Sequence, residues 1–422
     1  MMKIKMGLGA SFLWLMPALA APPQTTFSGK EFAFYQTLAP AALLVAEPNG
    51  KPLFADAAQQ ALIPASTTKL ITALLALQHW GADHHFVTEF KVHIHPNGQA
   101  VLHLQSSGDP FLVSEELARI AIELAKRLRA QGIYQLAYLQ MANRWYAEAI
   151  RLPGTGESLN PYDAINSAFS ANFNSLHVLK KHGQWLSAEP QTPITPTALQ
   201  IIKDAGLRLK DGQDERINTG TDPARNQQYA AELLIFFLRQ QGIEVLDETL
   251  RQMPVSPVTP ASVHYQHANQ KNLAQVISAM LRYSTNFIAN QLALNLVAEK
   301  THLPAQAAAV STYYAQALQH QFGWDAQQVR LVDGAGLSRQ NRLSAHQLWQ
   351  VLQALSPWRE LLPEIEPGVF AKSGSLVGVS TLAGYFYYRQ QWWPFVFLAN
   401  QPVPYRYRNQ LAKALYTQLP KE

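Results

Sequence analysis

The stretch PASTTKL, residues 64–70, is the starting point for interpreting this chain. Ser66 and Lys69 are three residues apart, and on a helix this spacing places both side chains on one face, where the amine can take the hydroxyl proton. The helix N-terminus and nearby cations would favour the neutral amine that a base needs. A capping serine beside a solvated lysine has the same pattern, but this is the only Ser-x-x-Lys in the chain and it opens an unusually apolar helix predicted to end at Trp80.

A second candidate motif is KSGS, residues 372–375, on a predicted strand at residues 369–376. Lys372 and Ser373 can hold a substrate carboxylate and donate a hydrogen bond to it. Gly374, followed by Ser375, lets another backbone approach the strand closely. Taken alone, the polar start of an ordinary strand explains these residues equally well.

The third element, Ser-x-Asn, occurs three times, at residues 158–160, 170–172 and 284–286. We favour Ser284 with Asn286, because this pair interrupts two strongly apolar helical stretches and buried polar groups need partners. The other two occurrences lie in sequence rich in Pro, Gly and Asn, where turns are a sufficient explanation.

The amino-acid composition limits the catalytic groups and the functions that are open to this chain. The 422 residues contain 34 Lys and Arg, 29 Asp and Glu and no Cys, and 48% of them are hydrophobic. This length suggests two to three globular domains. The absence of cysteine excludes disulfides, thiolate metal sites and cysteine nucleophiles, so covalent catalysis must use Ser, Thr, Lys or a carboxylate. A formal net charge of only +5 does not indicate nucleic-acid binding.

The first twenty residues are predicted to be an export signal. Two lysines precede an apolar run at residues 6–15, which leads to Ala18 and Ala20, and we expect cleavage after Ala20. The run is too short for a membrane anchor, and no later stretch has the length of a membrane span. We therefore expect a periplasmic protein that is soluble or loosely membrane-associated.

The remaining chain divides by its hydrophobic patterns. Residues 41–54 read as a hairpin around the turn PNG at 48–50. From about residue 86 the hydrophobic pattern changes. It predicts strands in which polar and apolar residues alternate, a helix at 114–130 and loop-rich connections. We predict a first domain formed by residues 21–85 and 256–422, and an inserted accessory domain at residues 86–255, with the second boundary uncertain by about a dozen residues.

Ser-x-x-Lys, Ser-x-Asn and Lys-Ser-Gly occur here in the order that characterises penicillin-binding proteins and serine β-lactamases. The chain resembles the class C low-molecular-mass penicillin-binding proteins of the D-Ala-D-Ala carboxypeptidase/endopeptidase family. The stretches DGAGLSR at 333–339 and STNFIA at 284–289 also resemble that family's sequences, as does the long insert after Lys69. Thr285, Ser373 and Ala335 depart from the family's usual Asp, Thr and Ser, respectively.

The resemblance implies an α/β (α+β) catalytic domain of the penicillin-binding/serine β-lactamase type. Its antiparallel sheet would be flanked by helices and would carry an inserted α/β accessory module. The implied activity is that of a serine D-Ala-D-Ala carboxypeptidase, or DD-endopeptidase, acting on peptidoglycan stem peptides and acylated by β-lactam inhibitors. Besides these ligands, a second copy of the chain, in a homodimer, is kept open as a partner.

Residue roles follow from the same resemblance. Ser66 would attack the carbonyl of the penultimate D-Ala while Lys69 takes its proton. Ser284 with Lys372 would relay a proton to the leaving amine, and Asn286 would orient Lys69 and the substrate amide.

The remaining implied roles concern substrate binding. The backbone N–H groups of Ser66 and Ser375 would form the oxyanion hole. Ser373, with Arg339 as a weaker candidate, would hold the terminal carboxylate. No metal and no cofactor is implied.

Three alternatives stay open at this point. A serine β-lactamase uses the same motifs, although those enzymes lack a large insert. The departures from the family pattern could mark a catalytically weak penicillin-binding scaffold. A zinc site among the histidines at 84–95 is conceivable but less favoured than a solvated strand face, because the accompanying ligands of zinc proteases are missing.

Overall fold

A computed structural model describes residues 26–105, 107–142, 145–147, 150–253, 260–325 and 327–420. The predicted export signal at residues 1–20 lies outside this described part. The α-helices are α1 (Lys30–Tyr35), α2 (Lys69–Trp80), α3 (Ser114–Ala130), α4 (Pro196–Asp204), α5 (Pro223–Gln240), α6 (Leu273–Tyr283), α7 (Asn286–Thr301), α8 (Ala307–Phe322), α9 (Ala345–Leu355) and α10 (Tyr407–Tyr416). Short 3-10 turns are η1 (Ala65–Thr68), η2 (Pro161–Asp163), η3 (Asn172–Asn174) and η4 (Ser356–Leu361).

The strands form three sheets. They are β1 (Ala41–Ala46), β2 (Pro52–Asp56), β3 (Val87–Ile94), β4 (Ala100–Gln105), β5 (Gln135–Ala142), β6 (Ser175–Lys181), β7 (Gln184–Ser187), β8 (Asp214–Asn218), β9 (Glu244–Met253), β10 (Val263–Ala268), β11 (Glu364–Glu366), β12 (Val369–Leu376), β13 (Val379–Tyr388) and β14 (Gln391–Ala399). The largest sheet has the order β11-β12-β13-β14-β1-β2, and all its pairings are antiparallel.

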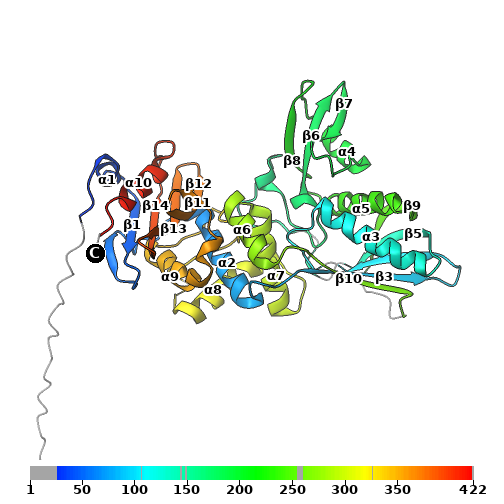
Figure 1. The fold of residues 1–422 in the computed structure, drawn as a ribbon, viewed down its shortest axis with the longest axis horizontal. Coiled ribbons are helices and arrows are strands. Elements are labelled where there is room, and N and C mark those ends of the chain that lie inside the picture. The colour runs from blue at the N-terminus through cyan, green and yellow to red at the C-terminus, as the bar shows by residue number, and fades with distance from the viewer. Residues whose placement is uncertain are drawn as a thin grey trace, which may run out of the picture.

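This six-stranded sheet is covered on both faces, and alternation along its strands explains why. In β1, Leu43 and Val45 pack with α1 and α10, whereas Ala42 and Leu44 pack in the larger core with α2 and α9. Successive side chains of a strand point to opposite faces. A strand that is apolar on both faces therefore needs a layer of helices on each side. Figure 1 shows α1 and α10 on the outer side of the sheet and the other helices on its inner side.

The inner layer holds the helices that carry the Ser-x-x-Lys and Ser-x-Asn motifs. Helix α7 is buried on nearly all sides and packs against α2. As expected, two helical stretches are interrupted at Ser284, which adopts a left-handed conformation with φ 56° and ends α6. Asn272 caps the start of α6: its side-chain oxygen accepts a hydrogen bond from the backbone N–H of Gln275.

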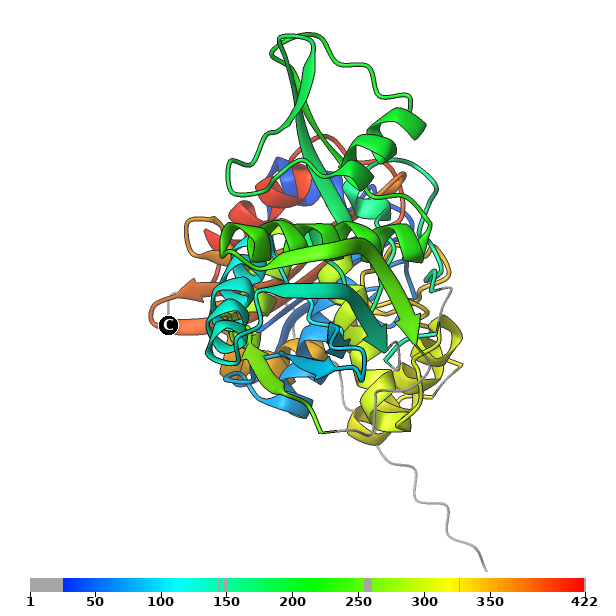
Figure 2. The ribbon, with the colours of Figure 1, turned by 90° about the vertical axis from the view of Figure 1, so that its right-hand side faces the viewer.

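Residues 87–268 contain the other two sheets. The five-stranded sheet has the order β10-β3-β4-β5-β9, in which β4, β5 and β9 run parallel. Helices α3 and α5 lie over it and share one core with it. The small sheet β7-β6-β8 projects away from this unit, as Figure 2 shows.

The fold class predicted from the sequence is confirmed: an antiparallel sheet flanked by helices, with mixed α/β structure inserted between its strands. Strand β10 pairs with β3 throughout its length. We therefore propose that the inserted unit runs from residue 86 to about residue 270 rather than to residue 255. No helix in the described part of the chain is long and apolar enough to cross a membrane.

Candidate active site

Ser66 and Lys69 meet at the junction of η1 and α2. The Nζ of Lys69 donates to the Oγ of Ser66 over 3.0 Å. Lys69 is fully buried, while Ser66 is half-buried and can be reached by a ligand. The helical spacing predicted for this pair therefore produces a direct contact between a hydroxyl and a buried amine.

Two further acceptors hold the amine of Lys69. Its Nζ lies 2.7 Å from the Oδ1 of Asn286 and 2.7 Å from the carbonyl oxygen of Ala335. Burial lowers the pKa of Lys69 well below its usual value, the charge of Lys372 lowers it further, and Asp333 opposes the shift. A buried lysine next to another cation favours its neutral form, which can accept the proton of Ser66.

Asp333 supports this arrangement without touching Lys69. Its carboxylate accepts hydrogen bonds from the backbone of Gly336 and Ser338 and from the side chain of Asn341, at 2.7 to 3.0 Å. These bonds hold the loop that presents the carbonyl of Ala335. In the sequence, this loop is visible only as a family-like stretch, and nothing marks Asp333, because its partners lie within a turn that has no periodic pattern.

Close backbone packing fixes the residue before Ser66. Ala65 has a φ of 48°, a left-handed conformation that costs free energy for a residue with a Cβ. Gly336 lies so close that a Cβ added to it would come within 1.9 Å of the carbonyl oxygen of Ala65. The glycine is therefore required by this contact as well as by its own positive φ.

Strand β12 passes on the other side of Ser66. A Cβ added to Gly374 would lie 2.7 Å from the backbone nitrogen of Ser66, so only glycine allows this approach. The neighbouring strand is joined to the same segment, since the Oγ1 of Thr381 donates to the carbonyl of Pro64. The KSGS motif thus lies against Ser66, and the close backbone approach occurs at its glycine.

Lys372 is 2% exposed and lies near Lys69. Its Nζ donates to the carbonyl of Ser373 over 2.7 Å. Burial lowers the pKa of Lys372 to about 7, with a further contribution from the charge of Arg408. The side chains of Ser373 and Ser375 are half-buried and exposed, respectively, so a ligand can reach both.

Of the three Ser-x-Asn pairs, the structure brings the one at 284–286 to Lys69, through Asn286. The other two pairs are engaged in local bonds: Ser158 donates to Asp163, and Ser170 bonds Ser167. Asn286 also donates from its Nδ2 to the carbonyl of Tyr162 over 3.1 Å. Its position at the start of α7, directly after the left-handed Ser284, is what aims its amide at the lysine.

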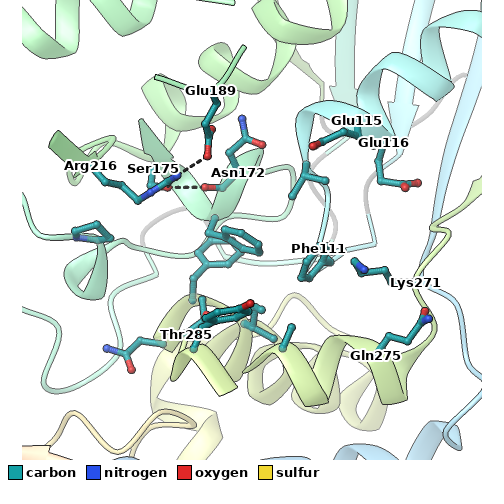
Figure 3. A pocket seen from close by; sticks show the side chains of 18 of the residues that line it. Phe111, Glu115, Glu116, Asn172, Ser175, Glu189, Arg216, Lys271, Gln275 and Thr285 are labelled. Carbon is teal, nitrogen blue, oxygen red and sulfur yellow. Dashed lines mark hydrogen bonds and ion pairs between the residues drawn. The ribbon is translucent and has the colours of Figure 1, made fainter. Parts of the chain in front are cut away.

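Ser284 and Thr285 face a large hollow rather than the protein core. The cavity has a volume of about 990 Å³ and extends from these two residues to the inserted unit. Aromatic side chains line it, namely Phe111, Tyr162, Phe173, Tyr283 and Phe287. Figure 3 shows Arg216 on its far side, where the guanidinium pairs with Glu189 and donates to Ser175.

In the part of the chain that the structure describes, Arg339 makes no hydrogen bond with Ser373. It is exposed, and its guanidinium donates to the carbonyl of Val377, at the turn between β12 and β13. Another guanidinium, that of Arg408 at the start of α10, donates to Ser375 instead. Sequence reasoning missed Arg408, because no motif surrounds it.

The histidine interpretation needs one correction. His93 is buried and its ring packs against that of His103, so this part of β3 is not a solvated face. No group of three or more His, Asp or Glu side chains in the described ranges could hold a metal ion.

The arrangement can be compared with known proteins. The sequence matches the D-Ala-D-Ala carboxypeptidase 3 (S13) family over residues 39–205 and 212–366. A D-alanyl-D-alanine carboxypeptidase of Actinomadura sp. (strain R39) is 30% identical over 186 residues, which are 42% of this chain and 32% of that protein. The chain therefore aligns with about a third of the length of this relative.

Solved structures share the fold over most of the chain. Penicillin binding protein 4 of Haemophilus influenzae, 20% identical, superposes with a TM-score of 0.73 and covers 94% of this chain and 100% of its own. The same protein has also been solved in complex with a β-lactam. A predatory peptidoglycan endopeptidase of Bdellovibrio bacteriovorus, 14% identical, reaches a TM-score of 0.56 with 90% and 91% covered. The family match spans most of the chain, and this protein belongs to the D-Ala-D-Ala carboxypeptidase 3 (S13) family.

Proposed function

We propose that this protein is a serine DD-peptidase that cleaves peptidoglycan stem peptides through an acyl-enzyme and is acylated by β-lactams. The observation that carries the proposal is the buried Lys69, bonded at once to Ser66 and Asn286, with Gly374 of β12 packed on the nucleophile. The names of the similar proteins, a carboxypeptidase, a penicillin binding protein and a peptidoglycan endopeptidase, support the same substrate class.

In the acylation step, Ser66 attacks the carbonyl carbon of the penultimate D-Ala and its proton passes to neutral Lys69. The backbone N–H groups of Ser66 and Ser375 stabilise the oxyanion, each contributing about 3 kcal/mol in comparable sites. Ser284, with Lys372, relays a proton to the leaving amine. Water then hydrolyses the ester and releases the peptide.

The cavity beside Ser284 is suited to the part of the stem peptide that precedes the cleaved bond. It opens at Ser284, Thr285 and Asn286 and is long enough to extend over the inserted unit. Its aromatic walls would cover the peptide, and its charged rim would meet the polar groups of the stem. We place the enzyme in the periplasm, exported by the signal at residues 1–20.

The two alternatives are less well supported. A β-lactamase needs a group that speeds hydrolysis of the acyl-enzyme. The carboxylate that bears on Lys69 is Asp333, and its oxygens are occupied by loop hydrogen bonds. A catalytically weak scaffold would have no need for a lysine held in a buried site next to a serine, because burying an amine costs free energy.

Incubation of the mature protein with purified muropeptides tests the proposal. Mass analysis would show the loss of terminal D-Ala from pentapeptides, the conversion of crosslinked dimers to monomers, or both. The same incubation with Ser66→Ala is the control. If neither product forms, or if both form equally with the variant, the proposed function is wrong.

Ser284→Ala is expected to slow acylation by penicillin about a hundredfold or more, because a positioned proton-transfer group typically contributes that much. Ser170→Ala is the matched control, since it removes a hydroxyl from another Ser-x-Asn pair. The second-order acylation rate measures the effect, and thermal melting checks the fold of both variants. An equal or larger loss in Ser170→Ala would contradict the choice of Ser284.

Lys372→Gln keeps much of the length and hydrogen-bonding capacity of the side chain but removes the cation. A charge-assisted hydrogen bond is worth about 1.5 to 3 kcal/mol, so acylation and D-Ala-D-Ala hydrolysis should fall together about ten- to a hundredfold. Because the pKa of Lys372 is about 7, the wild-type rate should also decline as the pH rises above neutrality and the cation is lost. This decline should be absent from Lys372→Gln.

Ser373→Thr is the control for this prediction, because it retains the hydroxyl and should leave both rates nearly unchanged. An unchanged rate in Lys372→Gln would make this lysine an ordinary strand residue.

A further inference from the structure

The amine of Lys69 has three polar neighbours, which differ in the hydrogen bonds they can make. A lysine ammonium has three N–H donors, so the neutral amine has two N–H groups and one lone pair. The Oδ1 of Asn286 and the carbonyl of Ala335 can only accept, and each lies 2.7 Å from Nζ, so they take the two N–H groups. The hydroxyl of Ser66, 3.0 Å away, can donate. The lone pair is therefore left for Ser66, which is the geometry that removal of its proton requires.

This geometry depends on which end of the Asn286 amide faces Lys69. A reversed amide would offer its Nδ2 donor to the lone pair and compete with Ser66. The neighbour on the other side of the amide is the carbonyl of Tyr162, 3.1 Å from Nδ2. A carbonyl can only accept, so it binds the Nδ2 end and leaves Oδ1 for Lys69. Tyr162 lies in η2, so this orienting group comes from the inserted unit.

The segment that carries the Tyr162 carbonyl is tied to α7 by buried amides. The Nδ2 of Asn166 donates to the carbonyl of Phe287 over 3.0 Å and to the Oε1 of Gln291 over 2.8 Å. The Nε2 of Gln291 donates back to the carbonyl of Ser167 over 2.9 Å. Both amide side chains are buried, and a buried amide without partners costs free energy. These bonds therefore fix the segment against the helix that begins at Asn286.

Helix α7 also holds the second acceptor of Lys69. The Oδ1 of Asn290 accepts from the backbone N–H of Gly334 over 3.0 Å. A Cβ added to Gly334 would lie 2.5 Å from the carbonyl oxygen of Ala289, so the loop before Ala335 packs directly on the helix. The inserted unit and this loop thus meet on one helix, and each supplies or orients one acceptor for the amine.

We propose that Asn166 and Gln291 are positioning residues for the acylation step. They hold the carbonyl of Tyr162, which orients the amide of Asn286. With the amide in this orientation, the lone pair of Lys69 points to the nucleophile. The inference rests on the proposed function, because it concerns the same proton transfer. It makes the inserted unit a part of the catalytic arrangement in addition to a wall of the cavity.

Gln291→Ala is expected to slow acylation by penicillin about ten- to a hundredfold and to move the acidic limb of the rate to lower pH. When the Asn286 amide is no longer fixed, the ammonium form of Lys69 loses an acceptor, so its pKa falls. The competing Nδ2 donor lowers the rate on the plateau. Partial unfolding would reduce the amount of adduct but would leave the limb in place. Lys372 and Asp333, whose charges also act on Lys69, are unchanged in this variant.

Asn295→Ala is the matched control. Asn295 is another fully buried amide of α7, but it donates to the carbonyl of Gly108 and accepts from the hydroxyl of Tyr146, in a different part of the inserted unit. Its acylation rate should stay close to that of the wild type, with the acidic limb unmoved. Asn166→Ala combined with Gln291→Ala should be no slower than the slower single variant, because both remove the same support. An equal loss of rate in Asn295→Ala, or an unmoved limb in Gln291→Ala, would overturn the inference.

A measurement without acylation separates this inference from the proposed function. Titration of isotope-labelled lysine side chains by NMR reports the pKa of Lys69, whose signal is assigned by its absence from Lys69→Met. The pKa should be lower in Gln291→Ala than in the wild type and unchanged in Asn295→Ala, even if the protein cleaves no peptide and binds no penicillin. Equal pKa values in the wild type and both variants would exclude the orienting role. Gln291→Met fills the buried site at similar length and serves in the same tests if Gln291→Ala does not fold.

Discussion

The mature protein is expected to gain the mass of one penicillin molecule per chain, and Ser66→Ala to gain none. Attack of the Ser66 oxygen on the β-lactam carbonyl opens the ring, so the whole drug stays attached through an ester. The half-buried hydroxyl touches a buried amine that can take its proton, and β12 packs on its backbone nitrogen. Loss of the oxygen removes the only atom of this arrangement that can form the bond, so the effect should be complete.

The adduct should also persist for long enough to be isolated. The spacing of Glu157, Leu159 and Asn160 comes within one residue of the motif that supplies the deacylating Glu in class A β-lactamases, but Glu157 is exposed and paired with Arg151. Asp333 is occupied in its loop. Intact-mass measurement over time, followed by mapping of the labelled peptide to residues 64–70, checks both statements. A mass gain in Ser66→Ala would refute the assignment of the nucleophile.

The parts of the fold that local patterns determine were predictable. Helix α3 occupies residues 114–130 as expected, because its apolar residues repeat at helical spacing and acidic residues stand in its first turn. The hairpin of β1 and β2 forms around the turn at 48–50, where Gly50 has a positive φ of 87°. The strand predicted at residues 369–376 is β12, with the same bounds.

Long-range pairings were not predictable from the same patterns. Strand β10 pairs with β3, more than 150 residues earlier in the chain, and on this pairing rests our proposal of a boundary near residue 270 in place of 255. Nothing in the local sequence of residues 263–268 specifies that partner. The hydrogen bond from Lys69 to the carbonyl of Ala335 was not predictable either, because a backbone carbonyl carries no sequence signature.

The residues of the candidate site also fall into two groups, those that the sequence could indicate and those that it could not. The sequence could propose Ser66, Lys69 and Asn286 because they belong to short motifs defined by side-chain type and spacing, and the structure places the three in contact. Arg408 donates to Ser375 from a position 33 residues further along the chain. Its charge would have been visible in the sequence only as one arginine among many, since no spacing rule relates the start of a terminal helix to a strand.

Lys69→Met is expected to reduce the second-order acylation rate by penicillin a thousandfold or more. Methionine has a similar length and fits an apolar site, but it offers no amine to take the proton of Ser66. General bases typically contribute about a hundred- to ten-thousandfold, and this one also holds Asn286 and the loop at Ala335 in place. Lys203→Met, on the exposed side of α4, is the control for loss of a lysine and should acylate normally.

The pH dependence separates a base from a merely structural lysine. Burial and the charge of Lys372 lower the pKa of Lys69, so in the wild type the rate should rise with pH as Lys69 loses its proton on the acidic side. In Lys69→Met this rise should disappear, because the group that titrates is gone. Lys69→Arg should be as slow as Lys69→Met, since a guanidinium stays protonated at every accessible pH. If Lys69→Met acylates within about tenfold of wild type, or keeps the same acidic limb, another group takes the proton of Ser66 and the buried amine serves only to hold Asn286 and the Ala335 carbonyl together.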